Sequence, residues 1–236
     1  MPPTSIIPIP AKLTPRSGSF ALDAATSIVA GNDLRSQAEL LRDQLRLATG
    51  LPLSVTSSGS GSRITLALDP SLGGLGDEGY RLTVTADEVA MRAPKSAGIL
   101  HASQTLRQLL PPAIFRRAPV PGGSWAISAV EIEDRPRFGW RGSHLDVGRH
   151  FMPKEFVLKH IDLLALHKFN VFHWHLTEDQ GWRIEIKKYP KLTSVGAFRK
   201  DSMTAPRTKD PALRKFSGRP HGGFYTQDDV REVVRY

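Results

Sequence analysis

The stretch SHLDVGRHFMPKEFVLKHIDLLALHKFNVFHWHL, residues 143–176, has the pattern of a strand, a helix and a second strand. Pro153 stands at the start of the helical part, where its missing N–H costs no hydrogen bond. Val157, Ile161 and Leu164 then recur on one stripe with charged residues opposite, as in a surface helix that covers a sheet. A βαβ unit of about 35 residues predicts a parallel sheet with a right-handed crossover.

Polar residues gather at the carboxyl end of the second predicted strand, NVFHWHL. Alternation places His173 and His175 on one face and Phe172 and Trp174 on the other, where they suit packing beneath helices. The segment that follows is Glu178, Asp179, Gln180, Gly181, Trp182 and Arg183. The first strand likewise ends at a glycine and an Arg-His pair. Because parallel α/β folds build their sites at the carboxyl ends of strands, both strands predict a site there.

The distribution of charge divides the sequence near Arg135. Residues 1–134 hold 12 Lys and Arg against 12 Asp and Glu, whereas residues 135–236 hold the remaining 20 against 11, which is the whole net charge of +9. Seven of the eight histidines also lie after this point. We therefore predict two domains, 1–134 and 135–236.

The first predicted domain mixes helices with strands. An amphipathic helix over 33–50 begins at Asp33, which can cap it, and ends at Gly50. The other predicted elements are strands at 64–68, 80–84, 89–93 and 126–134 and a helix over 97–110 closed by two prolines. This combination predicts a two-layer α+β domain, and no ligand chemistry is evident in it.

Composition excludes several classes of protein. Hydrophobic residues make up 40% and charged residues 23%, which is ordinary globular usage and unlike that of disordered, collagenous or membrane-spanning chains. Cysteine is absent, so disulfide frameworks, thiolate metal sites and cysteine nucleophiles are excluded. The first residues, MPPTSIIPIPAKL, lack a basic segment followed by a continuous apolar stretch. No signal peptide is therefore predicted, and the compartment stays open.

A longer run of sequence resembles a known family. The segment RGSHLDVGRHFMPKEFVLKHIDLLALHKFNVFHWHLTEDQGWRIEIKKYPKLTSVGAFRK, followed by GGFYTQDDVREVV, resembles the opening of the catalytic barrel in family 20 glycoside hydrolases, the β-N-acetylhexosaminidases. Residues 1–134, with EGYRLTV and SQTLRQLLPP, resemble the non-catalytic domain that precedes this barrel. The resemblance implies an α+β amino-terminal domain followed by the first part of a (β/α)8 TIM barrel.

The resemblance also implies a glycosidase that releases terminal N-acetylhexosamine from glycans or chitooligosaccharides. Its mechanism would be substrate-assisted and retaining, with the acetamido oxygen of the substrate in place of an enzyme nucleophile and with no cofactor. Arg149 matches the arginine that holds the C3 and C4 hydroxyls of the sugar, and a guanidinium fork suits two neighbouring oxygens. His175, Glu178 and Asp179 match polar residues that flank the pocket. The first acidic position supports the proton donor in the family and is Glu178 here, where many members have Asp.

The Asp-Glu pair that carries the family's catalysis is expected beyond Tyr236, because this sequence contains no Gly-Gly-Asp-Glu motif. A (β/α)8 barrel takes about 250 residues, far more than residues 135–236 supply. We therefore expect the amino-terminal portion of a hexosaminidase with a truncated barrel, inactive by itself. The alternative is a non-catalytic amino-sugar-binding remnant or pseudoenzyme that keeps Arg149 and Asp179 without the acid.

Two other functions compete with this one. His173, His175 and Asp179 together could bind a metal ion, but the further ligands that such a site needs are not evident, so no metal is expected. The basic stretch KKYPK at 187–191 and scattered cations such as Arg207 form no recognised nucleic-acid-binding motif. The expected partners are N-acetylhexosamine-terminated glycans, with neither nucleic acid nor a membrane.

Overall fold

The computed structural model describes residues 6–204 and 210–236. Arg207 of the scattered basic set lies outside these ranges, as do the first five residues of the segment considered for a signal peptide. The chain divides into two compact units. The first runs up to Gly139 and includes Leu166–Lys168, and the second comprises Trp140–Ala165 and Phe169–Tyr236.

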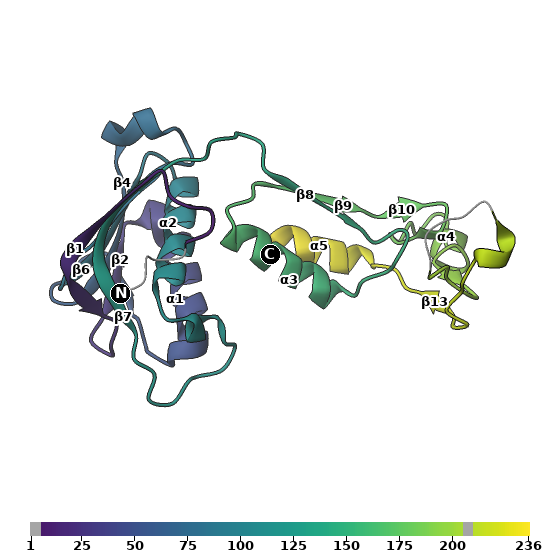
Figure 1. Ribbon diagram of the computed structural model, residues 1–236, viewed down its shortest axis with the longest axis horizontal. Coiled ribbons are helices and arrows are strands. Elements are labelled where there is room, and N and C mark those ends of the chain that lie inside the picture. Colours follow the sequence, from purple (N-terminus) through teal and green to yellow (C-terminus); the bar gives the residue numbers. More distant parts are fainter. Residues whose placement is uncertain (1–5, 205–209) are drawn as a thin grey trace. The chain divides into compact units, whose positions relative to one another are not determined.

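The first unit contains a seven-stranded mixed sheet. Its strands, in the order β1-β7-β5-β6-β4-β2-β3, are β1 (Lys12–Ala21), β7 (Ala126–Asp134), β5 (Tyr80–Val84), β6 (Glu88–Ala93), β4 (Arg63–Leu68), β2 (Ser27–Ala30) and β3 (Val55–Thr56). The pairs β1·β7, β7·β5 and β5·β6 are antiparallel, and the remaining three pairs are parallel. The helices are α1 (Arg35–Thr49) and α2 (Ser96–Leu109), with 3-10 turns η1 (Asn32–Leu34), η2 (Pro70–Leu75) and η3 (Pro112–Phe115). Figure 1 shows both α-helices on one side of the sheet.

The core of this unit confirms most of the predicted elements. Leu41 and Leu45 of α1 are fully buried, and Tyr80 and Leu82 of β5 face the same core. Gly50 ends α1 in the left-handed conformation with φ of 67°, as a helix stop requires. The prediction that Asp33 caps this helix is wrong. Asp33 lies within η1, and α1 begins at Arg35 without a side-chain cap.

The first unit contains a buried cluster of hydrogen-bonded polar side chains. The Lys168 ammonium lies 2.9 Å from a carboxylate oxygen of Asp134 and donates to the Tyr80 hydroxyl at 2.9 Å. That hydroxyl donates to the same Asp134 oxygen at 2.9 Å and lies 2.6 Å from the Thr105 hydroxyl. Burial acts to raise the pKa of Asp134, but the charge and hydrogen bond of Lys168, together with hydrogen bonds from the Ala11 amide and the Tyr80 hydroxyl, outweigh it, so the pKa lies below its ordinary value.

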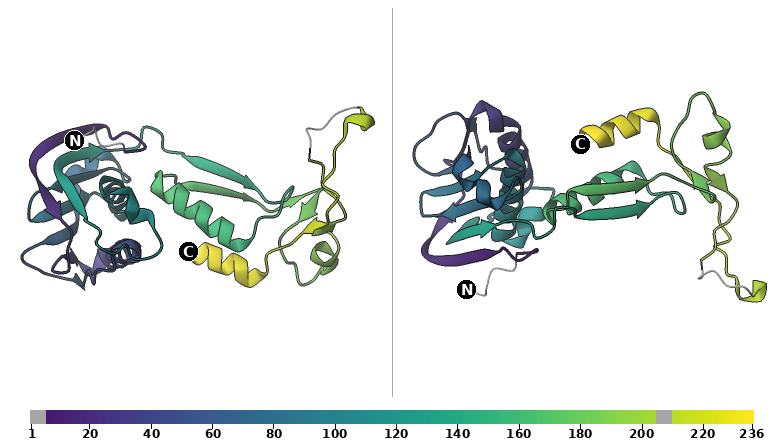
Figure 2. Two further views of the ribbon diagram at one scale, coloured as in Figure 1. Left: turned by 60° about the horizontal axis from the view of Figure 1, so that its bottom comes forward. Right: turned by 90° about the horizontal axis from the view of Figure 1, so that it is seen from above.

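The second unit starts with the predicted βαβ unit. Its elements are β8 (Gly142–Asp146), α3 (Lys154–Leu166), β9 (Val171–His175), β10 (Thr177–Glu178), β11 (Gly181–Trp182), α4 (Lys191–Ser194), β12 (Phe198–Arg199), the 3-10 turn η4 (Pro211–Leu213), β13 (His221–Gly222) and α5 (Gln227–Arg235). β8 and β9 are parallel, as predicted, while β10·β11 and β12·β13 are short antiparallel pairs. The left view of Figure 2 shows α3 and α5 on the same side of the β8–β9 pair.

The core of the second unit lies between the β8–β9 pair and the helices. Val157 of α3 and Val233 of α5 are buried in it, and Phe172 and Trp174 of β9 pack against it, as their alternation predicts. His173 on the opposite face is exposed. Among the residues that the structure describes, none of the helices is both long enough and apolar enough to cross a bilayer.

Candidate functional site

The carboxyl ends of β8 and β9 bring four polar side chains together. Pairing places Asp146, the last residue of β8, opposite His175, the last residue of β9. Three residues further along each segment stand Arg149 and Glu178. Because the strands are parallel, both extensions leave the sheet at the same edge. We refer to Asp146, Arg149, His175 and Glu178 as the strand-end cluster.

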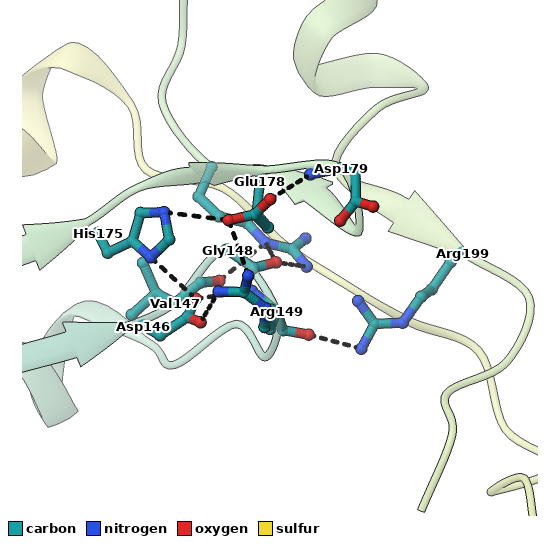
Figure 3. Close-up of polar contacts among 9 residues, drawn as sticks. Asp146, Val147, Gly148, Arg149, His175, Glu178, Asp179 and Arg199 are labelled. Atoms are coloured by element: carbon teal, nitrogen blue, oxygen red, sulfur yellow. Dashed lines mark hydrogen bonds and ion pairs between the residues drawn. The ribbon is translucent and has the colours of Figure 1, made fainter. Parts of the chain in front are cut away.

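The members of the strand-end cluster form a closed ring of polar contacts, which Figure 3 shows. Arg149 lies 2.5 Å from Asp146 through one guanidinium nitrogen and 3.0 Å from Glu178 through the other. The two ring nitrogens of His175 lie 3.5 Å from Asp146 and 3.5 Å from Glu178. Three residues that the sequence predicts at the site, Arg149, His175 and Glu178, are therefore brought together.

Local backbone geometry explains how Arg149 reaches this position. Its amide donates to the Asp146 carboxylate at 2.9 Å, which folds the chain into a tight turn directly after β8. Gly148 lies in that turn beside the β9 extension. A Cβ at this position would lie 3.0 Å from the Glu178 Cβ, so glycine permits the two segments to approach closely.

Interactions within the strand-end cluster favour the charged forms of Asp146 and Arg149. Partial burial acts to raise the pKa of Asp146, but the amide and guanidinium of Arg149 outweigh it and leave the pKa below its ordinary value. The hydrogen bond to Asp146 raises the pKa of Arg149. The Arg149 side chain remains 54% exposed, so its guanidinium can meet a solute while holding both carboxylates.

Asp179 lies beside the strand-end cluster and does not take part in the ring. Its amide donates to the Glu178 carboxylate at 3.3 Å, while its own carboxylate points away from His175 in Figure 3. Within the described part of the chain, that carboxylate makes no hydrogen bond to another side chain. Glu178, by contrast, reaches both Arg149 and His175 with one carboxylate oxygen.

Residues that the sequence did not single out also build this site. The sequence does not single out Asp146, because it is the last residue of a predicted strand. The pairing of β8 with β9 places it opposite His175 and so in the cluster. Arg199 donates to the carbonyl of Arg149 at 2.8 Å from 50 residues away. Arg183, predicted among the polar groups after the second strand, is instead fully buried. Its position directly after a Gly-Trp pair carries no signal of this burial.

Arg183 lies beneath the turn that carries Arg149. Its guanidinium donates to the carbonyls of Gly148 at 3.0 Å, Ala197 at 2.5 Å and Gly223 at 3.1 Å, and its Nε donates to Val147 at 3.0 Å. Burial lowers the pKa of Arg183, with the nearby charge of Arg199 adding to this effect. The side chain therefore joins three backbone segments at the base of the site.

The three residues considered as metal ligands, His173, His175 and Asp179, do not converge on one point. In residues 6–204 and 210–236, no group of three or more His, Asp or Glu side chains is arranged to hold a metal ion. His173 packs edge-on against His144, with ring centroids 4.6 Å apart, and Asp179 lies to the side of His175.

Comparison with known proteins identifies the family. The profile of the glycosyl hydrolase family 20 catalytic domain matches residues 138–236, and that of domain 2 of the same family matches residues 3–135. The chain belongs to glycosyl hydrolase family 20. The two matches together cover nearly the whole sequence, which confirms the resemblance found in its motifs.

Individual members of family 20 agree with this assignment. A β-hexosaminidase of Porphyromonas gingivalis is 41% identical over 98% of the chain, which spans 28% of that relative. The family 20 β-N-acetylhexosaminidase of Streptomyces coelicolor A3(2) has a TM-score of 0.81 and 37% identity, covering 99% of the chain and 44% of that structure. A Streptomyces plicatus β-hexosaminidase variant, solved with the product GlcNAc, has a TM-score of 0.80 and 38% identity, covering 99% and 43%. The chain thus spans less than half of the length of these relatives.

Proposed function

We propose that this chain supplies the first part of the catalytic (β/α)8 barrel of a β-N-acetylhexosaminidase, including part of the pocket for a terminal N-acetylhexosamine. The observation that carries the proposal is the convergence of Arg149, His175 and Glu178 at the carboxyl ends of two parallel strands. Sites of parallel α/β folds lie at these ends.

The strand-end cluster has the chemistry to bind neighbouring sugar hydroxyls. A hydroxyl both donates and accepts a hydrogen bond, and the Arg149–Glu178 pair offers a donor and an acceptor 3.0 Å apart. The exposed guanidinium would donate to the C3 and C4 hydroxyl oxygens, while Glu178 would accept a hydroxyl proton. The S. plicatus structure with GlcNAc supports this class of ligand.

The proposed roles differ among the four predicted residues. Arg149 would hold the sugar, and Glu178 with His175 would keep the Arg149 guanidinium in place and extend toward the reacting centre. Asp179 would line the rim, because its carboxylate lies outside the ring. The reaction itself would be substrate-assisted, and the Gly-Gly-Asp-Glu motif that would supply its acid does not occur in this sequence.

Sugar binding and turnover by the 236-residue chain test the proposal. N-Acetylglucosamine should bind the chain, as measured by ligand-observed NMR, and Arg149→Ala should weaken binding about tenfold or more because the guanidinium would no longer donate charged hydrogen bonds to the sugar. Arg219→Ala, at an exposed position outside the cluster, serves as the control. A chromogenic N-acetylglucosaminide should not be hydrolysed by the chain alone.

Two outcomes would contradict the proposal. Equal sugar binding by the parent chain and by Arg149→Ala would remove the proposed role of the strand-end cluster. A fusion of the chain to the remaining barrel of a family 20 relative provides the catalytic test. Such a fusion should hydrolyse the chromogenic substrate, whereas a correctly folded but inactive fusion would favour a non-catalytic sugar-binding protein.

A further inference from the structure

We propose that β12 and β13 form a clamp that positions Arg149, with Arg199 and His221 as its two positioning residues. We call this pair of residues the β12–β13 clamp. Its purpose, to hold Arg149 ready for a sugar, rests on the proposed function. The clamp itself rests on the hydrogen bonds of Arg199 and His221 and is tested without a sugar.

Arg199 ties together three segments of the second unit. Its guanidinium donates to the carbonyl of Arg149 at 2.8 Å and to the carbonyl of Gln180 at 3.1 Å, while its Nε donates to the Ser202 hydroxyl at 2.8 Å. The planar guanidinium holds its donors in a fixed fork, so the positions of these acceptors are coupled. Arg199 thereby connects the turn after β8 with the turn between β10 and β11, next to Glu178.

His221 holds the same segment from a second point. It pairs with Arg199 across the β12–β13 ladder, and its Nε2 accepts a hydrogen bond from the Phe151 amide at 2.9 Å. Its ring also stacks on that of His150, with centroids 4.0 Å apart and planes inclined by 24°. An acceptor at Nε2 requires the neutral ring with its proton on Nδ1. The clamp thus binds the carbonyl of Arg149 and the amide of Phe151, on either side of His150.

The contacts of Arg199 and His221 fix the position of the segment around Arg149 more than they stabilise the β12–β13 pair, which we call the β12–β13 ribbon. β12 and β13 have two residues each, too few for an independently stable hairpin, and Phe198 of β12 is 55% exposed. One contact of Arg199 and one of His221 reach the segment 149–151, and Arg183 holds the neighbouring Gly148 carbonyl from below. A displacement of about 1 Å at Arg149 would break its 3.0 Å contact with Glu178 and misplace any bound sugar.

Hydrogen–deuterium exchange of the full chain tests the clamp without any sugar. Arg199→Met should speed exchange about tenfold or more at the Arg149 amide, which donates to Asp146, while the β8–β9 ladder stays protected. His221→Phe should expose the Phe151 amide in the same way. Arg219→Met provides a matched exposed arginine and should change neither site.

Chemical rescue separates positioning from a general structural role. In Arg199→Ala, guanidinium ion at concentrations far below those that unfold proteins should restore slow exchange at Arg149, whereas ammonium ion should not. Unchanged exchange in Arg199→Met and His221→Phe would overturn the proposal. So would loss of protection throughout the second unit in Arg199→Met, because Arg199 would then support the fold as a whole.

A sugar-binding measurement then connects the clamp to the pocket. N-Acetylglucosamine should bind Arg199→Met about tenfold more weakly than the parent chain, at unchanged circular dichroism. Full affinity in a variant with fast exchange at Arg149 would show that the clamp does not serve sugar binding. Absence of binding by the parent chain would contradict the proposed function, while the exchange experiments would still decide whether the clamp exists.

Discussion

Among the described residues, each of the two units buries one Lys or Arg side chain, and the two cations are compensated differently. Lys168 in the first unit is paired with the carboxylate of Asp134, so the buried charge is neutralised. Arg183 in the second unit is fully buried against backbone carbonyls, and no carboxylate lies within ion-pair distance among the described residues. In the first unit, an ion pair allows both charged side chains to be buried. The second unit uses the several donors of one side chain to hold three backbone segments in place.

Removing the Lys168 charge should produce the largest change in stability. Lys168→Met would leave the Asp134 carboxylate, whose side chain is 11% exposed, without its cation. The free energy of unfolding in urea should fall by about 3–5 kcal/mol, as expected when one partner of a buried ion pair is lost. The double variant Lys168→Met with Asp134→Leu should recover a large part of this loss. A single variant as stable as the parent chain would show that the pair is not needed to compensate a buried charge.

Removing Arg183 should cost less, because it leaves only neutral groups behind. In Arg183→Met the carbonyls of Gly148, Ala197 and Gly223 lose their donor, while the cost of burying a cation disappears. We expect a loss of about 2–3 kcal/mol in the free energy of unfolding. A loss larger than that of Lys168→Met in the same urea titrations would reverse the comparison between the two units.

Acid should weaken the second unit before the first. Burial, with the nearby charges of His150, Arg199 and Arg183, lowers the pKa of His221 from 6.5 to about 4. Because the fold favours neutral His221, its contribution is complete above pH 6.5 and is lost as pH falls toward 4. For this partly buried ring we expect a loss on the order of 1–2 kcal/mol.

Exchange measured between these pH values locates the acid effect. After correction for the intrinsic pH dependence of exchange, amides of the β12–β13 ribbon should lose protection before those of β5 and β7. Asp134 in the first unit has a lowered pKa, so its pairing persists to a more acidic pH. His221→Phe should abolish the pH dependence near the ribbon. If this variant keeps the same pH dependence, another group is responsible.

The exposed ion pairs of the first unit should matter least. Arg16 and Glu131 lie 2.7 Å apart across β1 and β7, but both side chains are about half exposed. Arg16→Met should therefore leave the free energy of unfolding nearly unchanged, because an exposed ion pair is screened by solvent. The measurement is the same urea titration used for Lys168→Met. An effect as large as that of Lys168→Met would mean that burial does not separate the two kinds of pair.

Much of the fold could be predicted from periodicity. Alternation of Tyr80, Leu82 and Val84 predicts β5 with its observed bounds, and the helical stripe of Val157 predicts α3. β1 escaped prediction because it contains Pro15 and Gly18, which are unfavourable in strands. It forms at the edge of the sheet, with an irregularity between Pro15 and Ser19, because β7 supplies the pairing partner.

The site could be predicted only in part, for a similar reason. Arg149, His175 and Glu178 follow strands directly, so the geometry of a βαβ unit alone brings them to one edge. Asp179 follows the same rule, yet the β10–β11 turn directs its carboxylate away from the ring. Arg199 and His221 belong to short strands without a periodic signal, and their contacts with Arg149 and Phe151 span 50 and 70 residues of sequence.

The sequence by itself determined most of the longer strands and helices, where charge concentrates, and which family the motifs resemble. These properties depend on local spacing, which a helix or a strand converts directly into a face. The tertiary structure alone decided that Asp146 completes the ring, that Arg183 is buried beneath it, and that two short strands hold Arg149. Such contacts join segments far apart in the chain, and their geometry depends on how the whole second unit packs.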